Sequence, residues 1–373
     1  MPKLKVVTIL GTRPEIIRLS EIIKLADKTI EHILVHTGQN YDYELNEIFF
    51  EDLDLRKPNY FLNVVGKHLG ETIGNVISKS FELLSNIKPD ALLVLGDTNS
   101  VLCTIAAKRL KIPIFHMESG NRCFDQNVPE ETNRKISDHI SDINLTYTEH
   151  SRRYLLSEGF RKDHVFVTGS PLFEVLKNNN NKIETSSILT QLSLKRGAYI
   201  VLSTHREENI DIDNNFIILV NAINKVAEKY KLPIIFSTHP RTKNKIKNLG
   251  IKFNSLIQSI SPLGFFDYIY LQKNAYIVLS DSGTISEESA MMNFPAISIR
   301  TSTERPEAID TGNIVLGGIN ENDITNSIET CILTRSIDPF NIPSEYQVSN
   351  VSSRIIRIIQ SYTSVVNKVI WNK

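Results

Sequence analysis

The stretch KVVTILGTRPEIIRLSEIIKLAD, residues 5–27, decides the class of fold. It opens with a continuous apolar run, which is typical of a strand buried on both faces of a parallel sheet. Gly11 follows this run, and Pro14, a residue favoured at the first position of a helix, begins a helix-like segment. A strand followed directly by a helix predicts a right-handed βαβ unit.

The same pattern recurs on both sides of a break in the middle of the chain. Further apolar runs cover residues 32–37, 91–95, 112–117, 143–148 and 165–168, and then 198–204, 232–238, 255–260, 275–280, 295–300 and 313–316. Helix-like segments separate most of them. We therefore predict an α/β fold of two Rossmann-like, doubly wound domains that face a central cleft, in the GT-B-like manner.

The asparagine-rich stretch at residues 176–187 is predicted to link the two domains. The expected N-terminal domain covers residues 1–175, and a long helix over residues 351–373 is expected to join it. The expected C-terminal domain covers residues 188–350. A length of 373 residues fits two domains.

Composition excludes several classes of protein. Lys plus Arg and Asp plus Glu number 42 each, and this zero net charge disfavours nucleic acid and anionic membranes as partners. The three cysteines lack CxxC spacing, which argues against a disulfide framework or a metal site. No apolar run is long enough for a signal peptide or a membrane span, so we expect a cytoplasmic protein. The GxGxxG and Walker A patterns are absent, and no cofactor is expected.

Polar residues at the ends of strands are the candidate site, because ligands of open α/β sheets bind beyond the carboxyl ends of the strands. These residues are Arg13, Asp97, Glu118, His205, Asp281, Ser282 and Arg305. In the stretch DSGTISEE, residues 281–288, a helix start with two hydroxyls suits a phosphate, and an acidic residue in the first turns suits ribose hydroxyls. An ordinary capped helix with acidic residues near its positive end is the alternative.

Carboxylates are expected to gather from three elements. Asp97 and Glu118 each follow a strand, and Glu130 begins a helix after Pro129. Like charges in a partly dry site push pKa values apart and so yield one acid and one base. His205 would face them from the second domain. A cap or a surface ion pair would explain any one of these residues alone.

Six motifs in order give the chain a specific resemblance. They are GTRPE at 11–15, GDTNS at 96–100, PEETNR at 129–134, THREEN at 204–209, SDSGTISEE at 280–288 and TERPEA at 303–308. Together they resemble the non-hydrolysing UDP-N-acetylglucosamine 2-epimerase family over nearly the whole chain. That family epimerises by eliminating UDP and adding it back to a 2-acetamidoglycal, without metal or NAD. The resemblance implies a UDP-sugar substrate and a homodimer.

The resemblance also implies roles for individual residues. The catalytic group would be Asp97, Glu118, Glu130 and His205. The UDP ligands would be Arg13, Arg18, Tyr268, Ser282, Gly283, Thr284 and Glu288, with Thr284 standing where the family usually has glycine. The rest of the substrate pocket would include Asn133, Arg134 and Arg305.

Within the family, the segment at residues 120–134 is most similar to the branch that makes UDP-N-acetyl-L-fucosamine. That branch converts UDP-2-acetamido-2,6-dideoxy-L-talose for capsule or O-antigen synthesis. Conversion of UDP-N-acetylglucosamine to UDP-N-acetylmannosamine is the alternative. A UDP-sugar glycosyltransferase of the same fold, a hydrolysing epimerase and a non-catalytic UDP-sugar sensor are further alternatives. Many glucosamine epimerases bind an activating UDP-N-acetylglucosamine at a Gln-His pair; here the pair reads Gln39-Asn40, followed by Asp42, which predicts no such activation.

Overall fold

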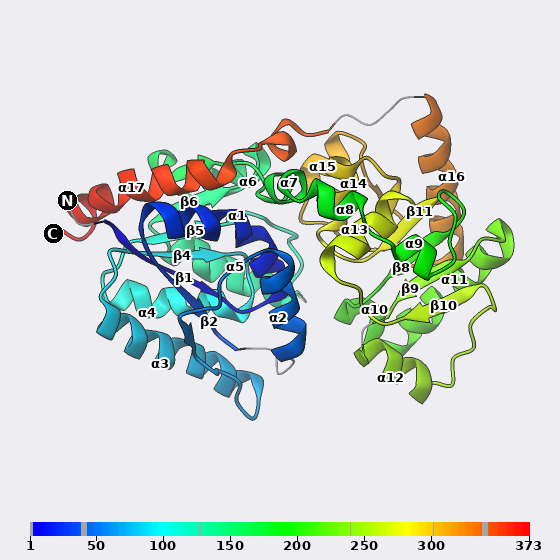
Figure 1. Cartoon of the computed structure of the whole chain (residues 1–373), viewed down its shortest axis with the longest axis horizontal. Coiled ribbons are helices and arrows are strands. Elements are labelled where there is room, and N and C mark those ends of the chain that lie inside the picture. Colours follow the sequence, from blue (N-terminus) through cyan, green and yellow to red (C-terminus); the bar gives the residue numbers. More distant parts are fainter. Residues whose placement is uncertain (1–2, 39–42, 127, 239, 301, 338–341) are drawn as a thin grey trace. The chain divides into compact units, whose positions relative to one another are not determined.

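Two units divide the chain between them in the computed structural model (Figure 1). It describes residues 3–38, 43–126, 128–238, 240–300, 302–337 and 342–373. One unit comprises Met1–Asn178 and Gln347–Lys373, and the other comprises Asn179–Tyr346. The prediction about activation rests on residues 39–42, which lie outside the described residues.

The first unit is built on a parallel sheet in the order β3-β2-β1-β4-β5-β6-β7. Its strands are β1 (Lys5–Leu10), β2 (Glu31–His36), β3 (Tyr60–Phe61), β4 (Ala91–Leu95), β5 (Ile114–Met117), β6 (Ile143–Thr146) and β7 (Val165–Val167). Apart from β3, each was predicted from its apolar run. The buried strand residues, such as Val7, Ile9 and Val94, form one hydrophobic core with the covering helices.

Helices connect these strands, as the βαβ pattern requires. They are α1 (Arg13–Thr29), α2 (Tyr43–Asp52), α3 (Leu69–Ile87), α4 (Cys103–Arg109), α5 (Pro129–Ile140), α6 (Glu149–Ser157) and α7 (Leu172–Asn178), with the 3₁₀ turns η1 (Asn99–Leu102) and η2 (Lys162–His164). The C-terminal helix α17 (Val351–Val369) packs against α1 (Figure 1). Buried Glu174 of α7 holds the start of α17. The Glu174 carboxylate accepts hydrogen bonds from Ser352 N at 2.8 Å and from Ser352 Oγ at 2.6 Å.

The second unit repeats the design with a parallel sheet in the order β10-β9-β8-β11-β12-β13. Its strands are β8 (Ile200–Ser203), β9 (Ile234–Ser237), β10 (Ile257–Ile260), β11 (Ile277–Ser280), β12 (Ala296–Ser298) and β13 (Val315–Leu316). Its helical elements are α8 (Asn180–Glu184), α9 (Ile188–Gln191), α10 (Glu207–Ile210), α11 (Asp213–Tyr230), α12 (Pro240–Asn248), α13 (Phe265–Lys273), α14 (Ile285–Met292), α15 (Pro306–Asp310), α16 (Glu321–Ile337) and η3 (Ser344–Gln347). The predicted α/β class with two Rossmann-like domains is confirmed.

The expected linker is largely helical. Residues 176–187 include the end of α7 and all of α8, and the division between the units falls after Asn178. The stretch is ordered against α13, because Ser186 Oγ donates to Asp267 Oδ1 at 2.5 Å and Lys273 pairs with Glu184. These contacts form only in the folded chain, so a polar composition alone does not reveal them.

Both sheets reverse their strand order at one point, and the two points are equivalent. In the first sheet, β1 and β4 are neighbours while their connections run to opposite sides. In the second sheet, β8 and β11 are the corresponding neighbours. Ligands of doubly wound sheets bind at the carboxyl ends of the strands at such a switch point. The loops after β1, β4, β8 and β11 are therefore where functional side chains are expected.

Candidate active site

Asp97 follows β4 at the switch point of the first sheet and receives two side chains from α5. Arg134 donates its Nε to Asp97 Oδ2 at 3.0 Å, and its Nη2 donates to the same oxygen. Asn133 Nδ2 donates to the Asp97 backbone oxygen at 3.0 Å. Helix α5 therefore fixes both the backbone and the carboxylate of Asp97, and the three residues, predicted from two separate motifs, lie together.

Glu118 lies at the end of the neighbouring strand, β5. Its φ of 62° places it in the left-handed region, which a residue with a side chain adopts only when its surroundings hold it there. A Cβ built on Gly96 would lie 3.6 Å from Glu118 Oε2, so this carboxylate points toward the residue that precedes Asp97. Glu130 is half-buried in the first turn of α5. Asp97 and Glu118 thus lie at the carboxyl edge of the first sheet, and Glu130 lies at the start of the helix that contacts Asp97.

Two arginines predicted as UDP ligands lie on α1. Arg13 is its first residue and is exposed, with its guanidinium carbon 5.4 Å from the centre of the Phe49 ring. Arg18 is buried, with its guanidinium carbon 5.5 Å from the centre of the Tyr147 ring. Cations over aromatic faces are held in place by the ring quadrupole. Arg13 adds its charge to the amide groups of a helix start, which is a favourable site for an anion.

Glu15 is a member of this region that the sequence did not single out. Its carboxylate accepts hydrogen bonds from Gly11 N at 3.1 Å, Thr12 Oγ1 at 2.7 Å, Thr98 Oγ1 at 3.2 Å and Ser100 Oγ at 2.5 Å. It therefore ties the loop after β1 to the loop after β4. Complete burial raises the pKa of Glu15 to about 7, although the four hydrogen bonds oppose that shift. A glutamate in the first turn of a helix is usually exposed and interacts with the positive end of the helix dipole. Nothing in the sequence therefore indicated that Glu15 is buried.

At the switch point of the second sheet, buried Asp281 organises the loop after β8. It accepts hydrogen bonds from Thr204 Oγ1 at 2.6 Å and from the backbone amides of His205 and Arg206 at 3.1 Å. Asn209 Nδ2 donates to it at 3.1 Å. The ring of His205 is half exposed, and its Nδ1 lies 3.3 Å from Asp281 Oδ1. Asp281 thus orients the predicted catalytic histidine.

The loop after β11 brings the predicted phosphate and ribose ligands together. Ser282 Oγ lies 3.0 Å from Thr284 Oγ1, which donates to Glu288 Oε1 at 2.8 Å. Gln272 Nε2 donates to Glu288 Oε2 at 3.0 Å. Thr284, the departure from the family pattern, therefore connects the serine hydroxyl to the carboxylate expected to bind ribose. A ligand at either residue would alter the hydrogen bonds of the other.

Arg206 is a second residue that the sequence did not single out. A Cβ built on Gly283 would lie 3.3 Å from Arg206 Nη2, so the guanidinium lies against the glycine of the predicted phosphate loop. Its charge is partly balanced by Glu304, 3.4 Å away. The signal was available, because the residue stands beside His205 in the motif THREEN.

The remaining predicted residues of the second unit lie near α14. Buried Arg305 pairs with buried Glu287, with 3.2 Å between Nη2 and Oε2. Tyr268 is half-buried on α13, the helix that also supplies Gln272. Gln272 of α13 and Arg305, just before α15, therefore both contact the first turn of α14, through Glu288 and Glu287.

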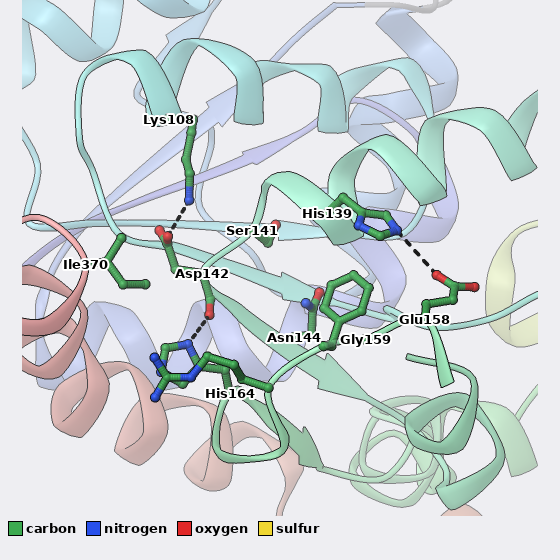
Figure 2. Close-up of a pocket in the computed structure, with 11 residues that line it drawn as sticks. Lys108, His139, Ser141, Asp142, Asn144, Glu158, Gly159, His164 and Ile370 are labelled. Atoms are coloured by element: carbon green, nitrogen blue, oxygen red, sulfur yellow. Dashed lines mark hydrogen bonds and ion pairs between the residues drawn. The ribbon is translucent and has the colours of Figure 1, made fainter. Parts of the chain in front are cut away.

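A pocket of about 240 Å³ opens elsewhere in the first unit, at the amino end of β6 (Figure 2). Its lining includes Asp142 and His164, and none of the predicted site residues. The charges on its wall already have partners: Lys108 pairs with Asp142 at 2.5 Å, and His139 lies 3.4 Å from Glu158. We therefore place the candidate site at the carboxyl edges of the sheets and not in this pocket.

Comparison with known proteins adds an independent observation. A family model described as UDP-N-acetylglucosamine 2-epimerase matches residues 24–360. The chain belongs to the UDP-N-acetylglucosamine 2-epimerase family. It is an isomerase, a carbohydrate 2-epimerase.

Members of this epimerase family with solved structures share the whole fold. A structure of UDP-N-acetylglucosamine 2-epimerase from Rickettsia bellii is 46% identical, covers 100% of both chains and superposes with a TM-score of 0.92. The Methanocaldococcus jannaschii enzyme in complex with UDP-GlcNAc and UDP is 36% identical, covers 96% of this chain and 99% of its own, and has a TM-score of 0.89.

Another member of the epimerase family carries a different substrate in its name. The UDP-2,3-diacetamido-2,3-dideoxy-D-glucuronate 2-epimerase of Pseudomonas aeruginosa is 32% identical over 88% of this chain and 92% of its own. Membership of the family therefore leaves the sugar open. In the described part of the chain, no helix combines the length and apolarity that crossing a bilayer requires.

Proposed function

We propose that this enzyme inverts C2 of a UDP-activated N-acetylamino sugar by eliminating UDP and adding it back. The proton on C2 is not adjacent to a carbonyl group, so it is not acidic by itself. When the C1–O bond breaks, its electron pair leaves with the diphosphate and positive charge develops at C1. A base then removes the C2 proton, and the C2–H electron pair forms the C1=C2 double bond of a 2-acetamidoglycal.

The return half of the reaction restores the sugar nucleotide with inverted configuration. A group on the opposite face donates a proton to C2 while a diphosphate oxygen attacks C1. The sequence of steps therefore needs two acid/base groups and a set of ligands for the leaving diphosphate. No net oxidation occurs, and the atoms balance without a co-reactant.

The observation that carries this proposal is the gathering of carboxylates in the first unit. Asp97 and Glu118 end neighbouring strands, and Glu130 begins the helix whose Arg134 binds Asp97. We assign the proton transfers to Asp97, Glu118 and Glu130 jointly. Asn133 and Arg134 act on Asp97 rather than as acid or base.

The second unit is proposed to hold UDP. The hydroxyls of Ser282 and Thr284 and the guanidinium of Arg206 border Gly283 and suit a diphosphate, which takes charged and neutral hydrogen bonds. Glu288 suits the ribose and Tyr268 suits the uracil ring. The half-exposed ring of His205, oriented by Asp281, and the buried Arg305 complete the proposed set in this unit. In the first unit, Arg13 and Arg18 are proposed as ligands of the diphosphate.

For the sugar, we propose UDP-N-acetylglucosamine in place of the L-talose nucleotide that the sequence predicted. The solved relatives reported above bear that name. The residues that suggested the fucosamine branch also make contacts inside the first unit. Arg122 is buried against Asp138 and Glu158, and Cys123 Sγ lies 3.5 Å from Glu131 Oε2. Internal packing therefore explains why these residue types occur here, and the residue types are weaker evidence for the identity of the sugar.

The L-talose nucleotide remains a second candidate because of the exposed residue in the same segment. Phe124 is 65% exposed and stacks edge-on with Tyr154 at 5.4 Å between ring centres. An exposed aromatic face suits the apolar 6-methyl group of a deoxysugar better than a hydroxymethyl group.

Incubating the purified protein with each UDP-sugar alone tests the proposal. NMR of the products separates the possibilities: an epimeric UDP-sugar supports it, whereas free sugar plus UDP indicates a hydrolase. No change with either sugar nucleotide would contradict the proposal and favour a glycosyltransferase or a sensor. The ratio of the kcat/KM values for the two sugar nucleotides decides between the two substrates.

A further inference from the structure

His116 is a buried histidine that the proposed chemistry does not use. It lies in β5, two residues before Glu118, and its side chain is fully shielded from solvent. Its Nε2 lies 2.7 Å from the backbone oxygen of Gly96, the residue that precedes Asp97. Its Nδ1 lies 3.0 Å from Asp138 Oδ1 on α5. The ring therefore spans the ends of two strands and the helix that follows them.

Both neighbours of the ring are acceptors. A backbone carbonyl oxygen can only accept a hydrogen bond. Burial works to raise the pKa of Asp138, but the charge of His116, together with Arg122, lowers it below its ordinary value. Asp138 is therefore an ionised acceptor as well. Only Nε2 makes a hydrogen bond, to the Gly96 oxygen, whereas Nδ1 lies at ion-pair distance from Asp138 without hydrogen-bond geometry. An ion pair with Asp138 requires a ring that carries two hydrogens and a positive charge.

The charges around the ring balance within the first unit. Arg122 Nη1 donates to Asp138 Oδ2 at 2.7 Å, and Arg122 also binds Glu158 through Nε and Nη2, at 2.7 Å each. Arg122 thus pairs with both anions, Asp138 and Glu158, and a protonated His116 would add a second cation beside Asp138. His139 also lies 3.4 Å from Glu158. Buried ions are tolerated when they are paired and hydrogen-bonded in this way.

The same cluster controls the backbone at the catalytic edge. Asp138 also accepts a hydrogen bond from Gly120 N, at 3.1 Å to Oδ2. Gly96, Glu118 and Gly120 all have φ between 62° and 78°, a conformation that strains the non-glycine member. Such strain persists only where the surroundings over-determine it. The ring of His116 and the carboxylate of Asp138 supply those constraints.

We propose that His116 is a positioning residue whose doubly protonated ring joins Gly96 to Asp138 and thereby sets the separation of the Asp97 and Glu118 carboxylates. This inference rests on the proposed catalytic role of those two carboxylates. His116 does not touch the substrate, because its side chain is buried. It acts through the backbone of Gly96 and through the α5 carboxylate.

Replacement of His116 by glutamine, with His164→Gln as the matched control, tests the proposal. His164 is also buried and also bonds a backbone carbonyl, with Nδ1 3.0 Å from the Asp142 oxygen, but it lies at the amino end of the sheet. We expect His116→Gln to lower kcat by about 10²-fold, since a displacement of about 1 Å costs that much. KM and UDP affinity should stay within about twofold of wild type. His164→Gln should lower the urea midpoint and leave kcat unchanged.

The protonation of the ring gives a readout that mere packing would not move. Long-range ¹H–¹⁵N spectra of the wild-type protein at pH 7 should show both nitrogens of His116 protonated. The signal is assigned by its loss in His116→Gln or, if that variant does not fold, by its change in Asp138→Asn. A neutral tautomer in the wild type would overturn the proposal, as would a folded His116→Gln variant with undiminished kcat. If the wild type epimerises no UDP-sugar, the proposed function fails, and the spectra alone still decide the state of the ring.

Discussion

Arg134 donates hydrogen bonds to Asp97 from two nitrogens of its guanidinium, Nε and Nη2. The third nitrogen, Nη1, donates to Glu131 Oε2 at 2.8 Å. This fork bridges the loop after β4 and the helix α5. A lysine at position 134 would keep the charge but lose the planar fork, and these two residues are not interchangeable at bidentate sites. The pair therefore fixes the direction of the Asp97 carboxylate as well as its charge.

Arg134→Lys should accordingly lower kcat by about tenfold or more and leave UDP affinity nearly unchanged, because the loss is one of orientation. NMR assays of epimerisation and calorimetry with UDP measure the two quantities. Arg161→Lys is the matched control, since Arg161 forms an exposed pair with Asp163 at 2.6 Å. Equal kcat in wild type and Arg134→Lys would remove the orienting role from Arg134.

Glu15 predicts an unusual dependence of stability on pH. Burial raises its pKa from 4.5 to about 7, so the folded protein binds a proton that the unfolded chain releases between these values. The stabilisation is fully present below pH 4.5 and is lost as pH rises to about 7. The size is on the order of 3 kcal/mol, since each pKa unit corresponds to about 1.4 kcal/mol.

Glu15→Gln removes this ionisation and keeps an acceptor oxygen for the surrounding donors. The free energy of unfolding of the variant relative to wild type should therefore rise between pH 5 and pH 8, as measured by urea titrations at several pH values. Glu31→Gln, at the exposed start of β2, serves as the control. A difference between Glu15→Gln and wild type that does not change with pH would show that Glu15 does not titrate in this range.

Loss of a charged ligand of the diphosphate should weaken UDP binding more than loss of a neutral one. Arg13→Ala should weaken UDP binding by roughly 1.5–3 kcal/mol, the usual loss for a charged hydrogen bond, and Ser282→Ala by about 1 kcal/mol. Calorimetric titration with UDP measures both. An Arg161→Ala variant provides the control for loss of a charge at a distance from the site. Unchanged affinity in Arg13→Ala would return Arg13 to a solvated residue beside Phe49.

The fold was largely readable from the sequence because buried parallel strands leave continuous apolar runs. Twelve of the described strands coincide with such runs, and β3 was missed because Tyr60–Phe61 is exposed and only two residues long. The polar residues at strand ends could be identified from the rule that places ligands there. The contacts of Asn133 and Arg134 with Asp97 could not be predicted, because they depend on the packing of α5 on the loop after β4.

The buried polar residues that the sequence did not reveal share one physical cause: distant segments of the chain bury them. Glu15 and His116 each lie in or beside a strand end, yet their partners are at Ser100 and Asp138. In the run IFHM, residues 114–117, the single polar residue His116 predicts nothing more than a minor interruption of an apolar strand. Only the three-dimensional arrangement shows that it faces two acceptors. The roles of the individual site residues stay predictions until their variants are measured.

The elimination mechanism predicts that hydrogen from solvent enters C2. The base that removes the C2 proton exchanges it with water, and the proton delivered to the other face comes from a group in equilibrium with solvent. Turnover in D₂O should therefore give product deuterated at C2, and prolonged reaction should label recovered substrate as well. A route through oxidation of a neighbouring hydroxyl would instead require a redox partner such as a bound dinucleotide. The chain lacks the GxGxxG fingerprint for a dinucleotide.

The carboxylate variants sharpen this test, because they should affect proton transfer and spare UDP binding. Asp97→Asn and Glu118→Gln should each lower kcat by about 10²–10⁴-fold, the usual loss for one acid/base group. UDP affinity should stay close to wild type, since the proposed diphosphate ligands lie on other residues. A slowed variant should also release some 2-acetamidoglycal and UDP, because the intermediate persists longer before UDP returns. Product without deuterium at C2, or full activity in both variants, would rule out elimination by these carboxylates.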